Sequence, residues 1–436
     1  MRFCSTKSGS PLVSYKDAAF DCLPADGGLY IPARAIDFRQ FFLHMDNKTS
    51  FNELVSVLTP SFFESSLNPV SASRFAEKAF TFQPELTRLD ENLSLLNLYN
   101  GPTGNFKDFG MAFMSAMFDE FLEKDERIVV LVSARPDAGS SAARAFRGRK
   151  DVLLVLVYPF GQLCGLDSSS LLQNGGNIIP VQIKGNFDDC QRLVIETILD
   201  RDFSRRYKVT SADSINVGGL LPQIFYFLYA FIQIKNSLSG DFFFSVPSGN
   251  FGSLVSGLYA WKFGMPVNGF IAAMNANNSL GEYFLGRPFA ASPRVITSSP
   301  ALDVSFPVNY ERLESFYKET PAVMRNMVFP VSVDDSLTLK TMEEVHENYN
   351  ILIDPHTAVA FAAAEKIITR NKMKWRAHTI VLATGRPANP AGPTEETDVK
   401  AGKTPDFSAA PEEKIDSSII IPPQVDSFQK AITGCL

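Results

Sequence analysis

The chain has 436 residues, of which 45% are hydrophobic, and its formal net charge is −6 at pH 7. This length exceeds what one simple core needs and predicts two or three domains. The modest charge and the lack of a long basic cluster argue against nucleic acid and anionic membrane surfaces as partners, which leaves a small molecule as the expected partner.

Five cysteines are scattered along the chain without metal-ligand spacing, as is typical of reduced thiols in the cytoplasm. The four histidines also lack that spacing, so we predict no metal site. No apolar segment of the kind that directs export occurs near the start. The most apolar stretch, residues 220–234, contains Pro222 and is too short to span a membrane. We therefore expect a cytoplasmic protein that is a monomer or a homodimer.

Along the chain, residues 1–83 are predicted to form an N-terminal segment rich in phenylalanine. From residue 84 to 390, apolar runs alternate with segments of helical periodicity, which predicts an α/β fold with two mostly parallel sheets covered by helices. Residues 391–436 are predicted to be a Pro-rich, polar C-terminal tail, exposed at 391–417. The expected strands are residues 93–99, 127–133, 151–158, 177–183, 242–246, 266–273 and 378–383.

One lysine stands at the junction between a predicted strand and a predicted helix. After residues 93–99 comes Gly-Pro-Thr-Gly-Asn-Phe-Lys-Asp-Phe-Gly, and large apolar residues then recur at helical spacing after Lys107. A cation in the first turn of a helix is unfavourable, because the helix dipole prefers anions there. We expect this position to lower the proton affinity of Lys107, as Schiff-base chemistry requires. The alternative is an ordinary surface lysine.

Three further loops follow predicted strands, and the strands of an open parallel sheet end at the edge where ligands bind. Residues 133–142 include Asp137 and open an alanine-rich helix. Residues 246–253 contain two glycines before a helix, and the backbone N–H groups of such a loop favour a phosphate. Residues 384–387 follow the last strand. Each loop taken alone is also typical of an ordinary turn.

A lysine, a phosphate-binding loop, an acid and a hydroxyl at one edge would together suit pyridoxal phosphate (PLP). This cofactor carries an aldehyde, a phosphate, a phenolic oxygen and a ring nitrogen, and each needs one of these groups. A nucleotide is a poorer fit, because the sequence contains neither Gly-x-Gly-x-x-Gly nor a Walker motif.

These motifs resemble those of threonine synthases. Residues 101–110 resemble their lysine motif, 246–252 their phosphate loop and 353–361 a motif of their C-terminal part, with shorter matches at 26–32, 185–191 and 211–217. The resemblance implies a PLP-dependent enzyme of fold type II, similar in fold to the β subunit of tryptophan synthase. It also implies a carbon–oxygen lyase that converts O-phospho-L-homoserine and water to L-threonine and phosphate.

The resemblance assigns roles to residues of this chain. Lys107 would carry PLP as a Schiff base, Thr384 would face the pyridine nitrogen, and Asp137 would lie near the cofactor oxygen. The residues that would hold the cofactor phosphate are Ser248, Gly249, Asn250, Phe251 and Gly252.

The match fails in the loops that receive the substrate. The family usually has Thr-Ser-Gly-Asp-Thr-Gly where residues 134–139 read Ala-Arg-Pro-Asp-Ala-Gly, and Phe160 and Gln162 replace two expected cations. A phosphate dianion needs charge-assisted partners, each worth about 1.5–3 kcal/mol. Recognition of O-phosphohomoserine would therefore require Arg135 or Arg386 as a substitute.

The last loop departs as well, because it has Arg386 where the family has His and Asn389 where it has Lys. Three functions therefore remain open: a threonine synthase, a PLP-dependent paralogue that performs β- or γ-elimination or replacement on another amino acid, and a non-catalytic PLP-binding relative. We interpret Asp354, Pro355 and His356 as the start of a helix, because an N-cap followed by proline explains this pattern without chemistry.

Overall fold

Three sheets organise the part of the chain that the computed structural model describes, which is residues 1–161, 176–284, 287, 289, 293–319, 321–370, 377–387 and 419–436. The larger sheet has six strands, all parallel to their neighbours except the edge strand β4, which is antiparallel to β5. Its strands in spatial order are β12 (Val328–Ser332), β11 (Gly269–Met274), β10 (Asp241–Pro247), β13 (Ala377–Ala383), β5 (Leu93–Asn97) and β4 (Glu85–Asp90).

The smaller sheet has five strands, and each pairs with its neighbours in parallel. Its strands in spatial order are β14 (Ile419–Ile421), β8 (Ile178–Ile183), β7 (Val152–Pro159), β6 (Ile128–Ser133) and β9 (Val209–Ser211). The two parallel sheets confirm the fold class that the alternation of apolar and helical segments predicts.

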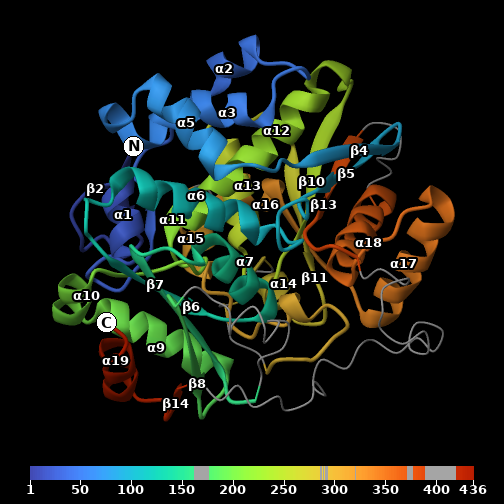
Figure 1. The fold of residues 1–436 in the computed structure, drawn as a ribbon. Coiled ribbons are helices and arrows are strands. Elements are labelled where there is room, and N and C mark those ends of the chain that lie inside the picture. Colours follow the sequence, from blue (N-terminus) through green and yellow to red (C-terminus); the bar gives the residue numbers. More distant parts are fainter. Residues whose placement is uncertain are drawn as a thin grey trace.

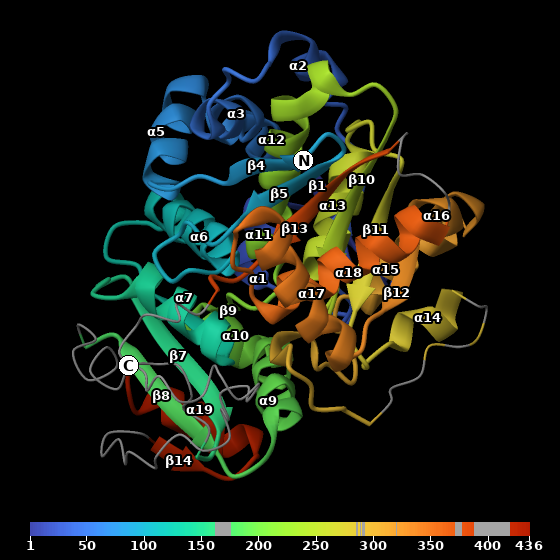
Figure 2. The same ribbon diagram turned by 90° about the vertical axis from the view of Figure 1, so that its right-hand side faces the viewer.

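The N-terminal residues form a small antiparallel sheet and a group of helices, of which α2 (Arg39–His44), α3 (Phe51–Leu58) and α5 (Pro69–Ala79) lie at the top of the molecule in Figures 1 and 2. The strands are β1 (Arg2–Ser5), β2 (Val13–Ser14) and β3 (Tyr30–Pro32). The helices are α1 (Tyr15–Asp21), α2 (Arg39–His44), α3 (Phe51–Leu58), α4 (Pro60–Phe63) and α5 (Pro69–Ala79).

Helices from the rest of the chain cover the two parallel sheets. They are α6 (Lys107–Phe121), α7 (Pro136–Phe146), α9 (Phe187–Leu199), α10 (Arg201–Tyr207), α11 (Val217–Leu220), α12 (Ile224–Ile234), α13 (Gly252–Lys262), α14 (Ser279–Phe284), α15 (Tyr310–Glu319), α16 (Pro321–Met327), α17 (Asp335–Tyr349), α18 (Pro355–Arg370) and α19 (Val425–Thr433).

The strands read as continuous apolar runs because both faces of each sheet are covered. In β11, Phe270 and Ala272 belong to the core shared with α12 and α13, whereas Ile271 and Ala273 pack with α18 on the other face. In the smaller sheet, successive residues of β6 and β7 alternate between a face covered by α7 and a face covered by α9. Parallel strands of this kind end at one edge, where the loops meet helix N-termini.

The described part of the chain contains one helical run, Val217–Ser237, that is long and apolar enough to cross a membrane by length and composition. Inside the protein, 83% of its most apolar window is buried. Its aromatic rings pack against those of Phe62, Phe109 and Phe244 at centroid distances of 5.3, 5.7 and 4.9 Å. These contacts identify the run as a core helix that joins the N-terminal helices to the larger sheet.

The C-terminal region contains more structure than a polar tail. Residues 419–436 form β14, which extends the smaller sheet beside β8, and α19, which packs against α9 at the bottom of the molecule in Figure 1. The segment 391–417, predicted to be exposed, lies outside the described residues. The boundaries proposed near residues 83 and 390 remain predictions.

Candidate active site

The loop before Lys107 is bonded to the loop after β13. The backbone N–H of Phe106 donates to the carbonyl of Thr384 at 3.0 Å, and that of Arg386 donates to the carbonyl of Gly104 at 2.8 Å. Gly104 has φ +76°, a left-handed conformation that favours glycine. Because β5 and β13 are neighbours in the larger sheet, these two loops form a single rim at its carboxyl edge.

A buried carboxylate shapes the turn that leads to the lysine. The Asp108 side chain accepts hydrogen bonds from the backbone N–H and the hydroxyl of Thr103, at 2.8 and 2.7 Å. A Cβ at Gly101 would lie 2.4 Å from Asp108 Oδ2, so only glycine fits there. The Gly-rich sequence is therefore explained by the close approach of this acid.

Asn105 connects the lysine loop to α7. Its Oδ1 accepts from the backbone N–H of Lys107 at 2.9 Å, at the start of α6. Its Nδ2 donates to the carbonyl of Asp137 at 3.2 Å and to Ser141 Oγ at 3.0 Å. Because one side chain bonds to the backbones of both Lys107 and Asp137, it fixes the relative position of the two loops. Sequence reasoning assigned Asn105 no role.

Lys107 and Asp137 form an ion pair. Lys107 Nζ lies 2.5 Å from Asp137 Oδ2, and the two side chains remain 28% and 26% exposed. Burial would raise the pKa of Asp137, but the charge of Lys107 and its hydrogen bond outweigh that effect and hold the pKa of the carboxyl below its usual value. Helix α6 begins at Lys107, as the sequence pattern predicts. The pattern gave no sign that Asp137 is the partner of the lysine.

The loop from Ser248 to Gly252 joins β10 to α13. The hydroxyl of Ser248 donates to the carbonyl of Val246 at 2.7 Å, so this side chain fixes the loop itself. Phe251 has φ 59°, and no side chain caps the start of α13. The first N–H groups of this eleven-residue helix therefore keep their capacity to bind an anion.

Close packing explains one glycine of this loop. A Cβ at Gly249 would lie 2.8 Å from the Cα of Leu302 and 2.9 Å from the carbonyl oxygen of Ala301, whereas a Cβ at Gly252 would meet only ordinary contacts at 3.5 Å and beyond. The loop is thus pressed against residues 301–302. At Gly252, by contrast, the neighbouring atoms leave room for a side-chain carbon.

The amide of Asn250 is engaged by the protein at both ends. Its Nδ2 donates to Ser214 Oγ at 2.9 Å, and its Oδ1 accepts from the backbone N–H of Val308 at 2.7 Å. The hydroxyl of Thr384, by contrast, has no hydrogen-bond partner among the described residues, and the residue is 9% exposed. Of the predicted cofactor residues, Asn250 supports the loop and Thr384 keeps a free donor.

His356 both belongs to a helix start and reaches this site. Asp354 Oδ1 accepts from the backbone N–H of His356 at 2.8 Å, and α18 begins at Pro355, as predicted. In addition, His356 Nδ1 lies 2.7 Å from Asp354 Oδ1, and Nε2 accepts from the backbone N–H of Ala301 at 3.1 Å. This pattern requires the hydrogen to be on Nδ1. The histidine therefore holds the segment that presses on Gly249.

Arg135 joins the loop after β6 to residues 300–303. Its guanidinium donates to the carbonyls of Pro300 and Asp303 at 3.3 and 3.2 Å and lies 4.5 Å from the ring centre of Phe187. Burial lowers the pKa of Arg135, and the like charge of Arg294 lowers it further, although Asp137 opposes this effect. Arg294, which is exposed, is thus near enough for its charge to act on Arg135. Neither forms an ion pair within the described residues.

The other substrate residues proposed from sequence lie less centrally. Arg386 is exposed, packs its side chain over Gly104 and donates to the carbonyl of Tyr99 at 3.5 Å. Phe160, where a cation was expected, is 57% exposed. Gln162 and Asn389 lie outside the described residues.

Asp213 is a further acid at the site that sequence reasoning missed. It accepts from the backbone N–H and the hydroxyl of Ser133 at 2.9 and 2.5 Å, at the end of β6. Burial raises the pKa of Asp213 to about 6, although the Ser133 bonds and the charge of Lys107 lower it and Asp137 raises it. The sequence signal that could have identified Asp213 is its position in residues 211–217, one of the short matches to threonine synthase motifs.

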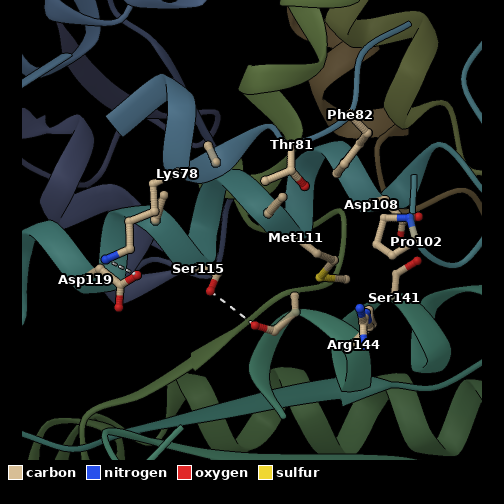
Figure 3. Close-up of a pocket in the computed structure, with 14 residues that line it drawn as sticks. Lys78, Thr81, Phe82, Pro102, Asp108, Met111, Ser115, Asp119, Ser141 and Arg144 are labelled. Atoms are coloured by element: carbon tan, nitrogen blue, oxygen red, sulfur yellow. Dashed lines mark hydrogen bonds and ion pairs between the residues drawn. The ribbon is translucent and has the colours of Figure 1, made fainter. Parts of the chain in front are cut away.

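A separate cavity of about 260 Å³ runs along α6 between α5 and α7 (Figure 3). Its walls include Asp108 and Ser141, which hold the lysine loop, and Lys78, which pairs with Asp119 at 2.7 Å. Neither Lys107 nor the loop before α13 lines it. This cavity therefore backs the site without being part of it.

Comparisons with known proteins agree with this geometry. Threonine synthase from Escherichia coli superimposes with a TM-score of 0.85 at 29% identity over 100% of both chains, and PLP-bound threonine synthase from Brucella melitensis with 0.80 at 26% identity over 100% of this chain and 99% of that one. Threonine deaminase isoform 2 from Solanum lycopersicum has a TM-score of 0.53 at 16% identity and covers 83% of this chain and 89% of its own, so it supports the fold alone. The chain has the fold of PLP-dependent enzymes of fold type II.

Sequence comparison defines the family. The family described as threonine synthase N terminus matches residues 2–80. Threonine synthase from Serratia marcescens is 31% identical over 392 residues, which are 89% of each chain. The chain therefore belongs to the threonine synthase family.

Proposed function

We propose that this protein is a threonine synthase, a PLP-dependent carbon–oxygen lyase that converts O-phospho-L-homoserine and water to L-threonine and phosphate. The observation that carries the proposal is the placement of Lys107, the free hydroxyl of Thr384 and the uncapped N-terminus of α13 after β5, β13 and β10, which are neighbours in the larger sheet. Asp137, from the loop after β6 of the smaller sheet, pairs with Lys107. Membership of the threonine synthase family supports it.

The residues present fit PLP. Lys107 would hold its aldehyde carbon, the N–H groups of residues 248–252 would hold its phosphate, and Thr384 would meet its ring nitrogen. When bound, PLP supplies an electron sink for charge that develops at the α carbon of an amino acid. The expected location is the cytoplasm, and the expected assembly is a monomer or a homodimer.

Lys107 is the residue placed to move protons at the substrate's α and β carbons. Asp137 is anionic at neutral pH, since its pKa is depressed, and the hydrogen bond that it accepts from Lys107 Nζ orients the lysine side chain. Asn105 keeps the two side chains in register. The bonds from Arg135 and His356 to residues 300–303 connect the loop after β6 to the larger sheet, which would limit the access of water.

The phosphate of the substrate needs cations, and this site offers three. Arg135 retains donor capacity beyond its two long bonds to carbonyls, and Arg294 is near enough to lower the pKa of Arg135. Arg386 stands at the rim of the lysine loop. We propose Arg135 and Arg294 as the main phosphate contacts, because the charge of Arg135 acts on Asp137 and the charge of Arg294 acts on Arg135. Arg386, at the rim of the lysine loop, is the outer alternative.

A substrate panel tests the reaction. The PLP-loaded protein would be incubated with phosphohomoserine, phosphoserine, phosphothreonine, serine and threonine, with threonine, phosphate and keto acid measured. We expect threonine and phosphate in equal amounts from phosphohomoserine alone. Keto acid as the main product would identify a paralogue with eliminating chemistry. Spectral change without product would identify a non-catalytic PLP-binding relative.

Variants test the phosphate contacts. Arg135→Gln and Arg294→Gln should each raise KM for phosphohomoserine by about 10- to 100-fold, because a charge-assisted hydrogen bond contributes about 1.5–3 kcal/mol. Retention of PLP should be unchanged. Arg127→Gln is the matched control, since it removes an exposed arginine on the same strand-to-helix unit. If KM stays constant in both variants and rises in Arg386→Gln, the outer cation binds the phosphate instead.

A further inference from the structure

Arg312, on α15, is a fully buried cation with neutral partners. The side chain is 0% exposed. Its Nε donates to the carbonyl of Tyr30 at 3.1 Å and its Nη2 to that of Ile215 at 2.6 Å. Its Nη1 donates to the carbonyl of Ser214 at 3.0 Å and to Asn309 Oδ1 at 2.6 Å. No carboxylate pairs with it anywhere in the described ranges.

These hydrogen bonds satisfy donors but leave the charge uncompensated. Burial lowers the pKa of Arg312, yet a guanidinium stays protonated in proteins. Of the three groups whose negative charge would act on it, Cys22 has its pKa raised by burial to about 12, and burial also raises the pKa of Tyr259 far above neutral. The third group, Glu311, has its carboxylate bonded to the hydroxyl of Thr6. Burying an unpaired cation is costly unless another anion offsets it.

Arg312 lies directly behind the loop that precedes α13. Two partners of Arg312, Ser214 and Asn309, connect it to that loop. The Ser214 hydroxyl oxygen accepts from Asn309 Nδ2 at 3.1 Å and from Asn250 Nδ2, in the loop, at 2.9 Å. A Cβ at Gly252 would lie 3.6 Å from Asn309 Nδ2. The guanidinium is therefore separated from the first turn of α13 by a single layer of side chains.

We propose that Arg312 is the buried counter-charge of the cofactor phosphate. It would not touch the phosphate but would act as a positioning residue, holding Ser214 and Asn309 under the loop and supplying the positive potential that a dianion requires. The inference rests on the proposed PLP site. It also gives the N-terminal region a role, because the Tyr30 carbonyl on β3 is one of the groups that fix this cation.

The experiment compares ligands with and without a phosphate. Dissociation constants for PLP and for pyridoxal would be measured by absorbance titration, together with competition by inorganic phosphate. Asn309→Asp places a carboxylate on Arg312 and cancels its charge while the side chain stays. Asn309→Ser is the matched control, because it removes the same amide without adding charge. Arg312→Met removes the charge, and Arg312→Lys keeps it.

We expect Asn309→Asp and Arg312→Met to raise the Kd for PLP at least tenfold more than Asn309→Ser and Arg312→Lys do, with equal Kd values for pyridoxal in all four. Equal weakening of PLP and pyridoxal by every variant would overturn the proposal and leave Arg312 a purely structural role. Circular dichroism checks the fold, and if Arg312→Met does not fold, the Asn309 pair decides. A wild-type protein that does not prefer PLP to pyridoxal would refute the proposed PLP site itself, which separates the two failures.

Discussion

The loops around the proposed cofactor site and the loop proposed to receive the substrate are built differently. Around the cofactor site, the loops after β5 and β13 bond to each other through their backbones at 2.8 and 3.0 Å, and the loop after β10 is pressed against residues 301–302. On the substrate side, Arg135 reaches its neighbours through two bonds longer than 3.1 Å, and Phe160 is 57% exposed.

This difference predicts that the two regions control different steps of the reaction. Loops that are held in place by bonds and packing within the chain itself are pre-organised for their ligand. A loop whose arginine forms no ion pair depends on the charge of the molecule that enters. Changes in the first region should therefore alter cofactor retention or the chemical step, whereas changes in the second should alter KM.

The largest effect is expected at Lys107. Lys107→Ala should lower kcat by about 10³-fold or more, because it removes both the group that holds PLP and the base that moves protons. The visible absorbance of bound PLP should disappear with it. Lys124→Ala, at an exposed lysine just beyond α6, should leave both measurements unchanged. Full activity in Lys107→Ala would place the chemistry elsewhere.

Two glycine variants in the loop before α13 should separate effects on folding from effects on PLP binding. Gly249→Ala should lower the melting temperature of the cofactor-free protein, because its Cβ would meet the backbone of Leu302 at 2.8 Å. It should also weaken PLP binding by about 10- to 100-fold, since overpacking costs about 1–3 kcal/mol.

Gly252→Ala should leave the melting temperature unchanged, because its nearest contacts begin at 3.5 Å, yet it should still weaken PLP binding where the phosphate approaches the loop. Unchanged PLP affinity in Gly252→Ala, measured by equilibrium dialysis, would mean that the phosphate is bound at another position.

A smaller, pH-dependent effect is expected at Asp213, which lies where the two regions meet. The pKa of this acid is raised from 3.8 to about 6 in the folded protein. Its contribution to stability is thus full below about pH 4 and is lost as the pH rises to about 6. The free energy of unfolding of the wild type should fall over that window, relative to Asp213→Asn, by on the order of 1–3 kcal/mol.

Melting temperatures of both proteins, measured at intervals across that pH window, check this expectation. Asp202→Asn is a control on an acid in the first turn of α10. A wild-type to Asp213→Asn difference that does not change with pH would contradict the raised pKa.

Much of the fold could be predicted because the strands that carry it are buried on both faces. β6, β7 and β10 appear in the sequence as continuous apolar runs, and the helix starts at Lys107 and Pro355 have local signals. β4 was missed because it is an edge strand without a buried residue, and β9 because it has three residues.

The parts of the site that could not be predicted depend on contacts between distant segments. Asp137 was expected beside the cofactor oxygen, but its partnership with Lys107 spans 30 residues. Arg312 lies among charged residues of α15 and looks in sequence like part of a solvated face, yet it is fully buried. Local patterns reveal periodicity and caps, whereas the burial of a charge is decided by how separate elements pack.

The strand β14 has a consequence for how the protein behaves in solution. Its backbone pairs with residues 181–183 of β8, and the N–H of Lys184 donates to the carbonyl of Ile421 at 2.9 Å. The buried side chains of Phe428 and Ile432 on α19 anchor it. An uncovered sheet edge is a template for pairing with other chains. Cleavage before residue 419, or a fusion partner that strains α19, would therefore expose β8 and promote self-association while the distant site stays intact.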